Sequence, residues 1–262
     1  AGAFNNNGTF TDSNGFDSAI NAGGGGGIFN NFGTFNKQSS TTTAVGTQFN
    51  STGTVNVNAG TMLMNGGGTN TGVFNVANGA KLEYRNGSHT MNSVTTSGAG
   101  TFEISTENVG ADATVALNGG THTTAFVLSG SVLTGTNHTF QGLATWSGGT
   151  ITGAATASTT FANDLTITGP NSKTLSGGRS VNAGNTNWTG NTGNGNNSIN
   201  ISGASVFNSS GTFTDSNTFD SAINVGNGGG AFNNSGIFNK QPNTATAVGT
   251  QFNSTGTVNV NA

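Results

Sequence analysis

The strongest pattern in the chain is a seven-residue phrase in which large apolar residues flank a polar turn. The phrase consists of Phe, Asn, Asn or Ser, any residue, Gly, Thr or Ile, and finally Phe or Val. Neighbouring copies begin at intervals of roughly 20 to 25 residues, and the same intervals recur near the end of the chain. The copies occupy residues 4–10, 29–35, 49–55, 207–213, 232–238 and 252–258, and a partial copy begins at Phe74.

The phrase predicts two short strands joined by a turn. Phe and Val favour strands, whereas Asn and Gly tolerate the backbone conformations that a turn requires. After the phrase, Val55, Val57 and Ala59 alternate with Asn56 and Asn58. Alternation with a period of two is typical of a strand that has one buried face. Each strand is therefore expected to be short and to end at a corner rich in Gly or Asn.

Intervals of roughly 20 to 25 residues indicate the single turns, or coils, of an all-β parallel β-solenoid. Coils stacked at the usual strand separation of ~4.8 Å place like residues over like residues. The phenylalanines that begin the phrases are then expected to form an internal stack: Phe4, Phe29, Phe49, Phe74, Phe207, Phe232 and Phe252. The asparagines that follow them are expected at the corners, where their amides form a ladder along the axis: Asn5, Asn30, Asn50, Asn208, Asn233 and Asn253.

A longer repeat defines the domain organisation. Residues 8–59 realign with residues 211–262 at an offset of 203, and 43 of the 52 positions are identical. We therefore expect one complete tandem unit over residues 1–203 and the start of a near-identical unit over residues 204–262, in one continuous solenoid. Residues 100–200 are less regular. The polar stretch 185–197, in which Trp188 is the one large apolar residue, predicts a loop or wide corner.

Composition narrows the possible classes of protein. Gly, Thr and Asn, which are poor helix formers, supply 130 of the 262 residues. The net charge of −3 and the 18 phenylalanines argue against a disordered chain. Six basic residues are too few for a nucleic-acid surface. The chain has no cysteine for disulfides or thiolate metal sites, and it lacks the ~20-residue apolar run of a membrane span.

Three segments carry a resemblance to a known class of protein. They are the Phe-Asn-x-x-Gly-Thr-Phe phrases, the stretch Val55–Gly60, and the stretch Trp146–Gly153. The chain resembles the β-helical repeats of bacterial extracellular proteins, such as filamentous-haemagglutinin-like adhesins and autotransporter passengers. The resemblance implies a right-handed parallel β-helix, export from the cell, and a role as a fibre, stalk or adhesive surface. It implies no catalytic residue.

Candidate chemistry is sparse. Asp12 and Asp17 recur as Asp215 and Asp220, and such carboxylates suit calcium. Their spacing matches neither an EF-hand nor a calcium β-roll, so solvated turn residues are the favoured interpretation. His89, His122 and His138 lack the short spacing of a zinc site and are expected in turns or at edges.

Two further alternatives concern carbohydrate and ice. Glu103 and Glu107 provide a pair of carboxylates of the kind that glycosidases use, whereas Lys81, Glu83 and Arg85 are interpreted as a solvated strand face. Two Thr-x-Thr motifs, 150–152 and 166–168, resemble ice-binding ladders but do not recur at every coil.

The sequence thus predicts a non-enzymatic structural protein without catalytic, cofactor-binding or metal-binding residues. It is expected outside the cell or on its surface, as a fibre or adhesin. Its first expected partners are copies of itself, and surface glycans rank second. The alternative is a β-helix that binds or cleaves a polysaccharide, and ice binding ranks third.

Overall fold

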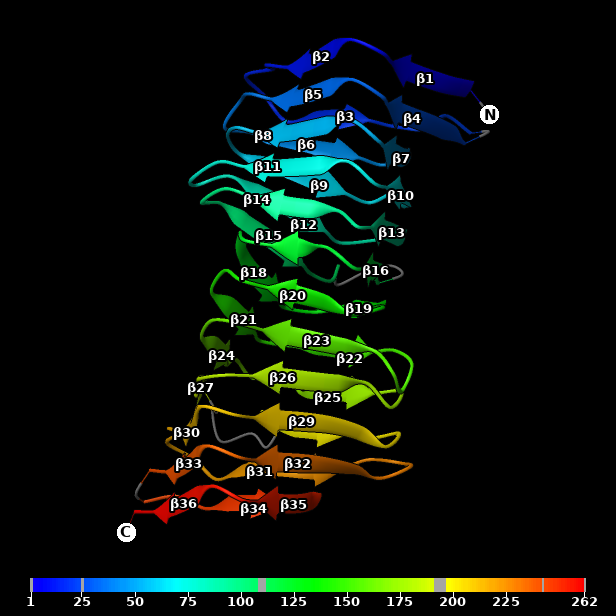
Figure 1. Cartoon of the computed structure of the whole chain (residues 1–262). Coiled ribbons are helices and arrows are strands. Elements are labelled where there is room, and N and C mark those ends of the chain that lie inside the picture. Colours follow the sequence, from blue (N-terminus) through cyan, green and yellow to red (C-terminus); the bar gives the residue numbers. More distant parts are fainter. Residues whose placement is uncertain (1, 25, 108–111, 191–196, 242, 262) are drawn as a thin grey trace. The chain divides into compact units, whose positions relative to one another are not determined.

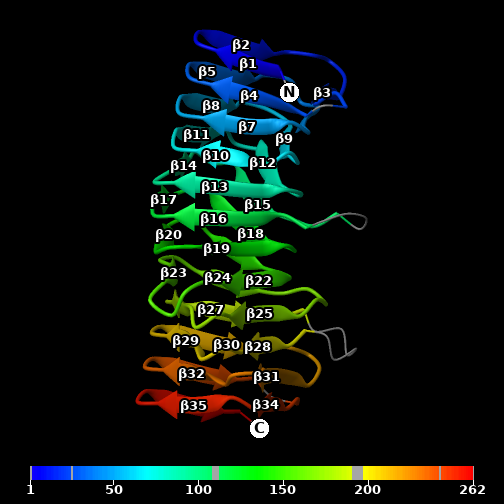
Figure 2. The same ribbon diagram turned by 90° about the vertical axis from the view of Figure 1, so that its right-hand side faces the viewer.

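The computed structural model describes residues 2–24, 26–107, 112–190, 197–241 and 243–261. These residues form short β-strands and contain no helix. The fold is therefore all-β, as expected. The chain divides into an N-terminal unit, Ala1–Val127, and a C-terminal unit, Leu128–Ala262. Each unit is a parallel β-solenoid in which three consecutive strands complete one coil (Figures 1 and 2).

The N-terminal unit contains three parallel sheets, and each sheet takes every third strand of the chain. The first sheet is β1 (Gly2–Asn6), β4 (Gly27–Asn31), β7 (Gln48–Ser51), β10 (Gly68–Asn70), β13 (Ser88–Asn92) and β16 (Thr114–Asn118). The second is β2 (Thr9–Asp12), β5 (Thr34–Lys37), β8 (Thr54–Val57), β11 (Val73–Val76), β14 (Thr95–Ser97) and β17 (Thr121–His122). The third is β3 (Ser18–Ile20), β6 (Thr42–Val45), β9 (Thr61–Met64), β12 (Lys81–Tyr84) and β15 (Thr101–Ile104). Strand β18 (Ala125–Leu128) spans the boundary between the units.

The C-terminal unit repeats this plan. Its first sheet is β19 (Val132–Gly135), β22 (Gly149–Thr152), β25 (Lys173–Ser176), β28 (Ile199–Ile201), β31 (Ser221–Val225) and β34 (Thr246–Val248). Its second is β20 (His138–Phe140), β23 (Ser158–Phe161), β26 (Ser180–Ala183), β29 (Ser205–Ser209), β32 (Gly230–Asn234) and β35 (Gln251–Ser254). Its third is β21 (Ala144–Trp146), β24 (Leu165–Ile167), β27 (Thr186–Trp188), β30 (Thr212–Asp215), β33 (Ile237–Lys240) and β36 (Thr257–Val260).

The coil length varies somewhat more than the intervals between the phrases suggest. Paired residues are separated by as few as 18 positions, as for Val132 and Thr150, and by as many as 27, as for Thr186 and Phe213. The difference lies in the corners. In the C-terminal unit, the corner between β31 and β32 spans residues 226–229, and the corner between β34 and β35 spans only residues 249–250. Strands thus stay in register while corners absorb the extra residues.

The internal aromatic stack is present in both units. Phe29 and Phe49 are paired on neighbouring coils, with ring centroids 5.4 Å apart and nearly parallel planes. A second stack, from the phenylalanines that end the phrases, packs edge-on against the first, as Phe29 and Phe35 do at 5.7 Å and 76°. Phe207 and Phe232 stack in the same way as Phe29 and Phe49, at 5.2 Å. Offset and edge-to-face contacts are the favoured aromatic geometries, and they fill the narrow interior.

The predicted place of Phe74 in that stack is wrong. Phe74 lies in the second sheet of its unit, where it is paired with Val55. The coil that contains Phe49 is a short one, because Ser51 already pairs with Asn70 on the next coil. The interval between Phe49 and Phe74 is therefore longer than one coil, and it carries Phe74 past the first sheet into the second.

The predicted corner position of the phrase asparagines is also wrong, although the amide ladder exists. Asn30 lies within β4 and faces outward, because its neighbours Phe29 and Asn31 take the inward positions of the strand. Its amide donates to Asn5 Oδ1 at 2.8 Å, and its own Oδ1 accepts from Asn50 at 3.1 Å. In the C-terminal unit the corresponding ladder joins residues 182, 208, 233 and 253.

The asparagine beside the corner is instead the third residue of the phrase, which is the last residue of the strand. Asn31 is fully buried, and its Nδ2 donates to Ser51 Oγ at 3.0 Å and to the carbonyl of Thr54 at 3.1 Å. The phrase glycine is needed for close contact between neighbouring coils, and not for the positive φ that a turn would suggest. A Cβ on Gly53 would lie 2.0 Å from the carbonyl oxygen of Gly33, so this position accepts only a residue without a side chain.

The stretch 185–197 is not a loop throughout, as the sequence had suggested. Residues 186–188 form β27, and Trp188 is fully buried beside Ile167 and Asp215 of the adjacent coils. Residues 191–196 of this stretch lie outside the described residues. Residues 165–167, which precede this stretch, form β24.

Candidate functional site

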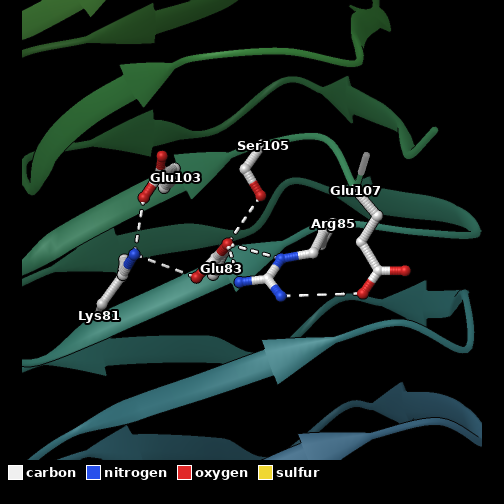
Figure 3. Close-up of polar contacts among 6 residues, drawn as sticks. All are labelled: Lys81, Glu83, Arg85, Glu103, Ser105 and Glu107. Carbon is white, nitrogen blue, oxygen red and sulfur yellow. Dashed lines mark hydrogen bonds and ion pairs between the residues drawn. The ribbon is translucent and has the colours of Figure 1, made fainter. Parts of the chain in front are cut away.

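Five charged side chains of the N-terminal unit gather on β12 and on the segment that begins with β15. Lys81 and Glu83 lie on β12, and Arg85 follows it directly; Glu103 lies on β15, and Glu107 comes shortly after it. This charged cluster also includes Ser105 (Figure 3). It holds five of the chain's 15 charged residues, which makes it the natural place to look for chemistry.

Glu83 is at the centre of the charged cluster. Its side chain is only 4% exposed, and it pairs in register with Glu103 on the next coil. Two carboxylates directly opposite one another in a sheet repel each other. Lys81 relieves this repulsion, because its Nζ lies 3.1 Å from Glu83 and 2.9 Å from Glu103.

The other oxygen of Glu83 accepts three further hydrogen bonds. Arg85 donates through Nε at 3.0 Å and through Nη2 at 2.8 Å, and the Ser105 hydroxyl donates at 2.7 Å. Arg85 also reaches Glu107, at a distance of 3.7 Å between Nη1 and Oε1. Figure 3 shows the resulting chain of contacts from Glu103 through Lys81, Glu83 and Arg85 to Glu107.

These contacts determine the protonation of Glu83 and Lys81. Burial alone would raise the pKa of Glu83, but hydrogen bonds from Ser105, Arg85 and Lys81 outweigh burial and hold the pKa below its ordinary value. Burial would likewise lower the pKa of Lys81, yet its bonds to Glu103 and Glu83 raise it. All of these changes favour the charged forms. A carboxylic acid that donates a proton to a leaving group needs a raised pKa instead.

Glu103 and Glu107, the predicted carboxylate pair, therefore bind different cations: Glu103 contacts Lys81 and Glu107 contacts Arg85. The expectation of a merely solvated strand face at Lys81, Glu83 and Arg85 is wrong for Glu83, which the two cations cover. The signal was present in the sequence. Residues at i, i+2 and i+4 of a strand share one face, so their alternating charges bring opposite charges together.

The repeated aspartates stabilise corners within their own units. Asp12 accepts hydrogen bonds from the backbone and side chain of Asn14 and from the hydroxyls of Ser18 and Thr43. Burial would raise the pKa of Asp12, but these bonds outweigh it and lower the pKa. Asp17 accepts instead from the backbone amide of Thr42 at 2.7 Å.

The second copy has the same arrangement. Asp215 accepts from Asn217, Ser221 and Thr246, and Asp220 accepts from the amide of Ala245 at 2.7 Å. Asp12 and Asp215 are buried rather than solvated, which corrects half of the expectation for these turn residues. In the part of the chain that the structure describes, no three His, Asp or Glu side chains gather as a metal-ligand set.

The expectation that the histidines lie in turns or at edges is wrong. His89, His122 and His138 lie on β13, β17 and β20, and all three are buried. Burial lowers the pKa of both His89 and His122 to about 4, so both rings are neutral at pH 7. The strand alternation could have placed them, because His89 shares the inward face with Met91, and His138 shares it with Phe140.

The two Thr-x-Thr motifs do not form one surface. Thr150 lies on β22, between Val132 and Thr174, whereas Thr166 lies on β24, between Thr145 and Asn187. These strands belong to different sheets. Each threonine thus has a threonine neighbour on only one side, which is too short a row for an ordered ladder.

Comparison of the chain with protein-family models, with curated proteins and with solved structures found no match. Among the described residues, no helix has the length and hydrophobicity to cross a membrane.

Proposed function

We propose that the chain is part of an extracellular structural protein, a fibre or adhesive stalk built from tandem β-solenoid repeats. The observation that supports the proposal most strongly is the in-register repetition of the coil. Phe lies over Phe and Asn over Asn in each unit, as in the pairing of residues 28–31 with residues 48–51. A repeat of this kind can be extended to any length without a new core.

The outward faces suit such a role. Amide ladders present hydrogen-bonding groups at the spacing of the coils, and charged side chains are few. A surface of this composition can bind the hydroxyls of glycans or the same surface of a neighbouring fibre. The charged cluster fits a structural role as well, because ion pairs and hydrogen bonds hold Glu83 and Lys81 in their charged forms.

Immunogold electron microscopy of the native cells tests the proposal. Antibodies raised against the purified chain are expected to label intact cells, along thin filaments of roughly constant width. Labelling that appears only after the cells are permeabilised would contradict an extracellular role, and labelling of isolated compact particles would contradict a fibre.

The alternative, a polysaccharide-cleaving β-helix, is tested with the purified chain. Turnover of a polysaccharide that is lost in Glu103→Gln and in Glu107→Gln, while binding is retained, would replace the structural proposal with an enzymatic one. Binding without turnover is the result expected of an adhesive surface.

A further inference from the structure

A buried lysine in the C-terminal unit points directly at a side-chain carboxamide. Lys173 begins β25 and is fully buried. Its Nζ donates to Asn197 Oδ1 at 2.5 Å and to the carbonyl of Gly169 at 2.8 Å, and it forms no ion pair with any described residue. Asn197 is itself only 2% exposed. From this geometry we infer that Lys173 and Asn197 form an intramolecular isopeptide bond between Nζ and the side-chain carbon of Asn197.

The surrounding residues fix the orientation of the Asn197 amide. Its Nδ2 donates to Asn217 Oδ1 at 3.1 Å and to the carbonyl of Thr189 at 3.3 Å, so its Oδ1 must face Lys173. Asn217 is held in turn by Asp215, which accepts from Asn217 Nδ2 at 2.7 Å. The carbon to be attacked is one bond from Oδ1, so the nucleophile and its target are already in contact. Holding two reacting groups together in this way can accelerate a reaction by several orders of magnitude.

Lys173 is also suited to act as a nucleophile. Burial lowers its pKa to about 8, so a substantial fraction of Nζ is the free amine in mildly alkaline solution. A desolvated lysine amine is an established kind of protein nucleophile. The buried position keeps water away from the carbonyl, which disfavours the competing hydrolysis.

The reaction is balanced without another reactant. The free amine of Lys173 attacks the side-chain carbon of Asn197, and the new Nζ–C bond forms. The bond from that carbon to Nδ2 then breaks, a proton passes from Nζ to Nδ2, and ammonia leaves. Nothing is oxidised or reduced. Because Lys173 is paired with Ile199 on the next coil, the bond links adjacent coils covalently.

Two other buried lysines serve as controls within the same chain. Lys37 donates to the carbonyl and hydroxyl of Ser39, and Lys240 donates to the carbonyl of Gln241 and the hydroxyl of Thr244. Neither contacts a side-chain carboxamide, so neither has an equivalent carbon to attack. We expect the bond at Lys173 alone.

Peptide mapping of the purified protein tests the inference. The chain has only six lysines and arginines, so trypsin releases few peptides. Without the bond, trypsin cuts after Lys173 and releases residues 174–179 as a separate peptide. With the bond, Lys173 resists cleavage, and residues 86–179 remain attached to residues 180–240 in one branched peptide. The intact protein is then lighter by one molecule of ammonia.

The expected result, after incubation of the folded protein near pH 8, is the branched peptide together with the mass loss. Both should be absent from Lys173→Met and from Asn197→Ala. Both should persist in Lys240→Met, where the second arm of the branched peptide extends past residue 240 because that cleavage site is lost. Full recovery of the free peptide 174–179 from the wild-type protein would overturn the inference. Loss of ammonia without a branched peptide would overturn it equally, because an asparagine can also lose ammonia by cyclising onto its own backbone.

Discussion

Two segments of identical sequence, residues 44–58 and residues 247–261, differ in the burial of their inward apolar side chains. In the N-terminal unit, Val57 is completely buried, whereas its equivalent in the C-terminal unit, Val260, is 75% exposed. Both lie at inward positions of a strand. Val57 is covered by Val76 of the following coil, whereas β36, which contains Val260, is the last strand of its sheet. The direction of a side chain is therefore set by its own sequence, and its burial by the next coil.

The strongest test of this comparison removes the same ring from both segments. Phe49→Ala is expected to lower the free energy of unfolding by ~3–5 kcal/mol, because a cavity replaces a fully buried ring. Phe252→Ala should cost about half as much, because Phe252 has a coil on only one side. Urea unfolding followed by circular dichroism measures both. Equal losses would show that the covering coil contributes little.

Acidification distinguishes coils filled by phenylalanine from coils that bury histidine. His89 and His122 have folded-state pKa values lowered to about 4 from 6.5, so the unfolded chain binds more protons between those values. Their contribution is complete above pH 6.5 and is lost as the pH falls toward 4. At about 1.4 kcal/mol per pKa unit, the loss is on the order of 3 kcal/mol for each ring.

Unfolding measured at pH 7 and at pH 4 tests this expectation. Carboxyl groups also titrate in this range. The informative quantity is therefore the loss of unfolding free energy between pH 7 and pH 4, compared between the wild type and His89→Gln. The variant should be less sensitive to acid, and an unchanged sensitivity would show that His89 is not neutral in the folded protein.

Replacing a phrase glycine by alanine tests whether the close contact between neighbouring coils requires a residue without a side chain. Gly53→Ala is expected to cost about 3 kcal/mol, because the added carbon meets the Gly33 carbonyl at 2.0 Å. Gly8→Ala is the matched control. No atom lies within 4 Å of its added carbon, so its cost should stay within about 0.5 kcal/mol. A thermal melt of each variant suffices, and similar melting temperatures would contradict the contact.

The smallest expected effect separates inward from outward asparagines. Asn31→Ala leaves buried donors and acceptors at the corner without partners, which costs about 1–3 kcal/mol. Asn30→Ala removes one rung of an exposed ladder and should cost only about 0.5 kcal/mol. Denaturant midpoints of the two variants can be compared directly. The reverse order would place the stabilising asparagines on the outside.

The spacing of the phrases was sufficient to predict the fold and much of the register. Phe29 over Phe49 and Asn30 over Asn50 follow directly from the offset between the two phrases. The prediction failed where the coil length changed, as at Phe74, because the position of one phenylalanine does not show how many residues the preceding corners contain. The pairing register can be predicted only when the residues of a whole strand are aligned.

Buried polar residues were the second failure. Lys37 is fully buried, although lysines usually remain at the surface. Its position in the strand, two residues after Phe35, had already placed it on the inward face. The same alternation places His138 with Phe140 and Lys240 with Phe238. In strands this regular, the alternation with a period of two predicts which side chains are buried better than the usual burial preference of each residue type does.

The partners within the charged cluster could be found only in part. The spacing of Lys81, Glu83 and Arg85 places them on one strand face, but their pairing with Glu103 depends on the next coil. The contact between Lys173 and Asn197 was equally hidden. It joins two residues 24 positions apart, in a region where no phrase marks the register.

Corners of different length between strands of similar length indicate where residues can be inserted into such a chain. The corner between β31 and β32 has four residues, 226–229, whereas the equivalent corner of the next coil, between β34 and β35, has only two, 249–250. The strands on either side of these corners still pair in register. Lengthening a flexible connection costs little free energy. These corners are thus permissive places for inserted peptides, and a series of grafted epitopes could be displayed there at regular intervals, each carried on an undisturbed scaffold.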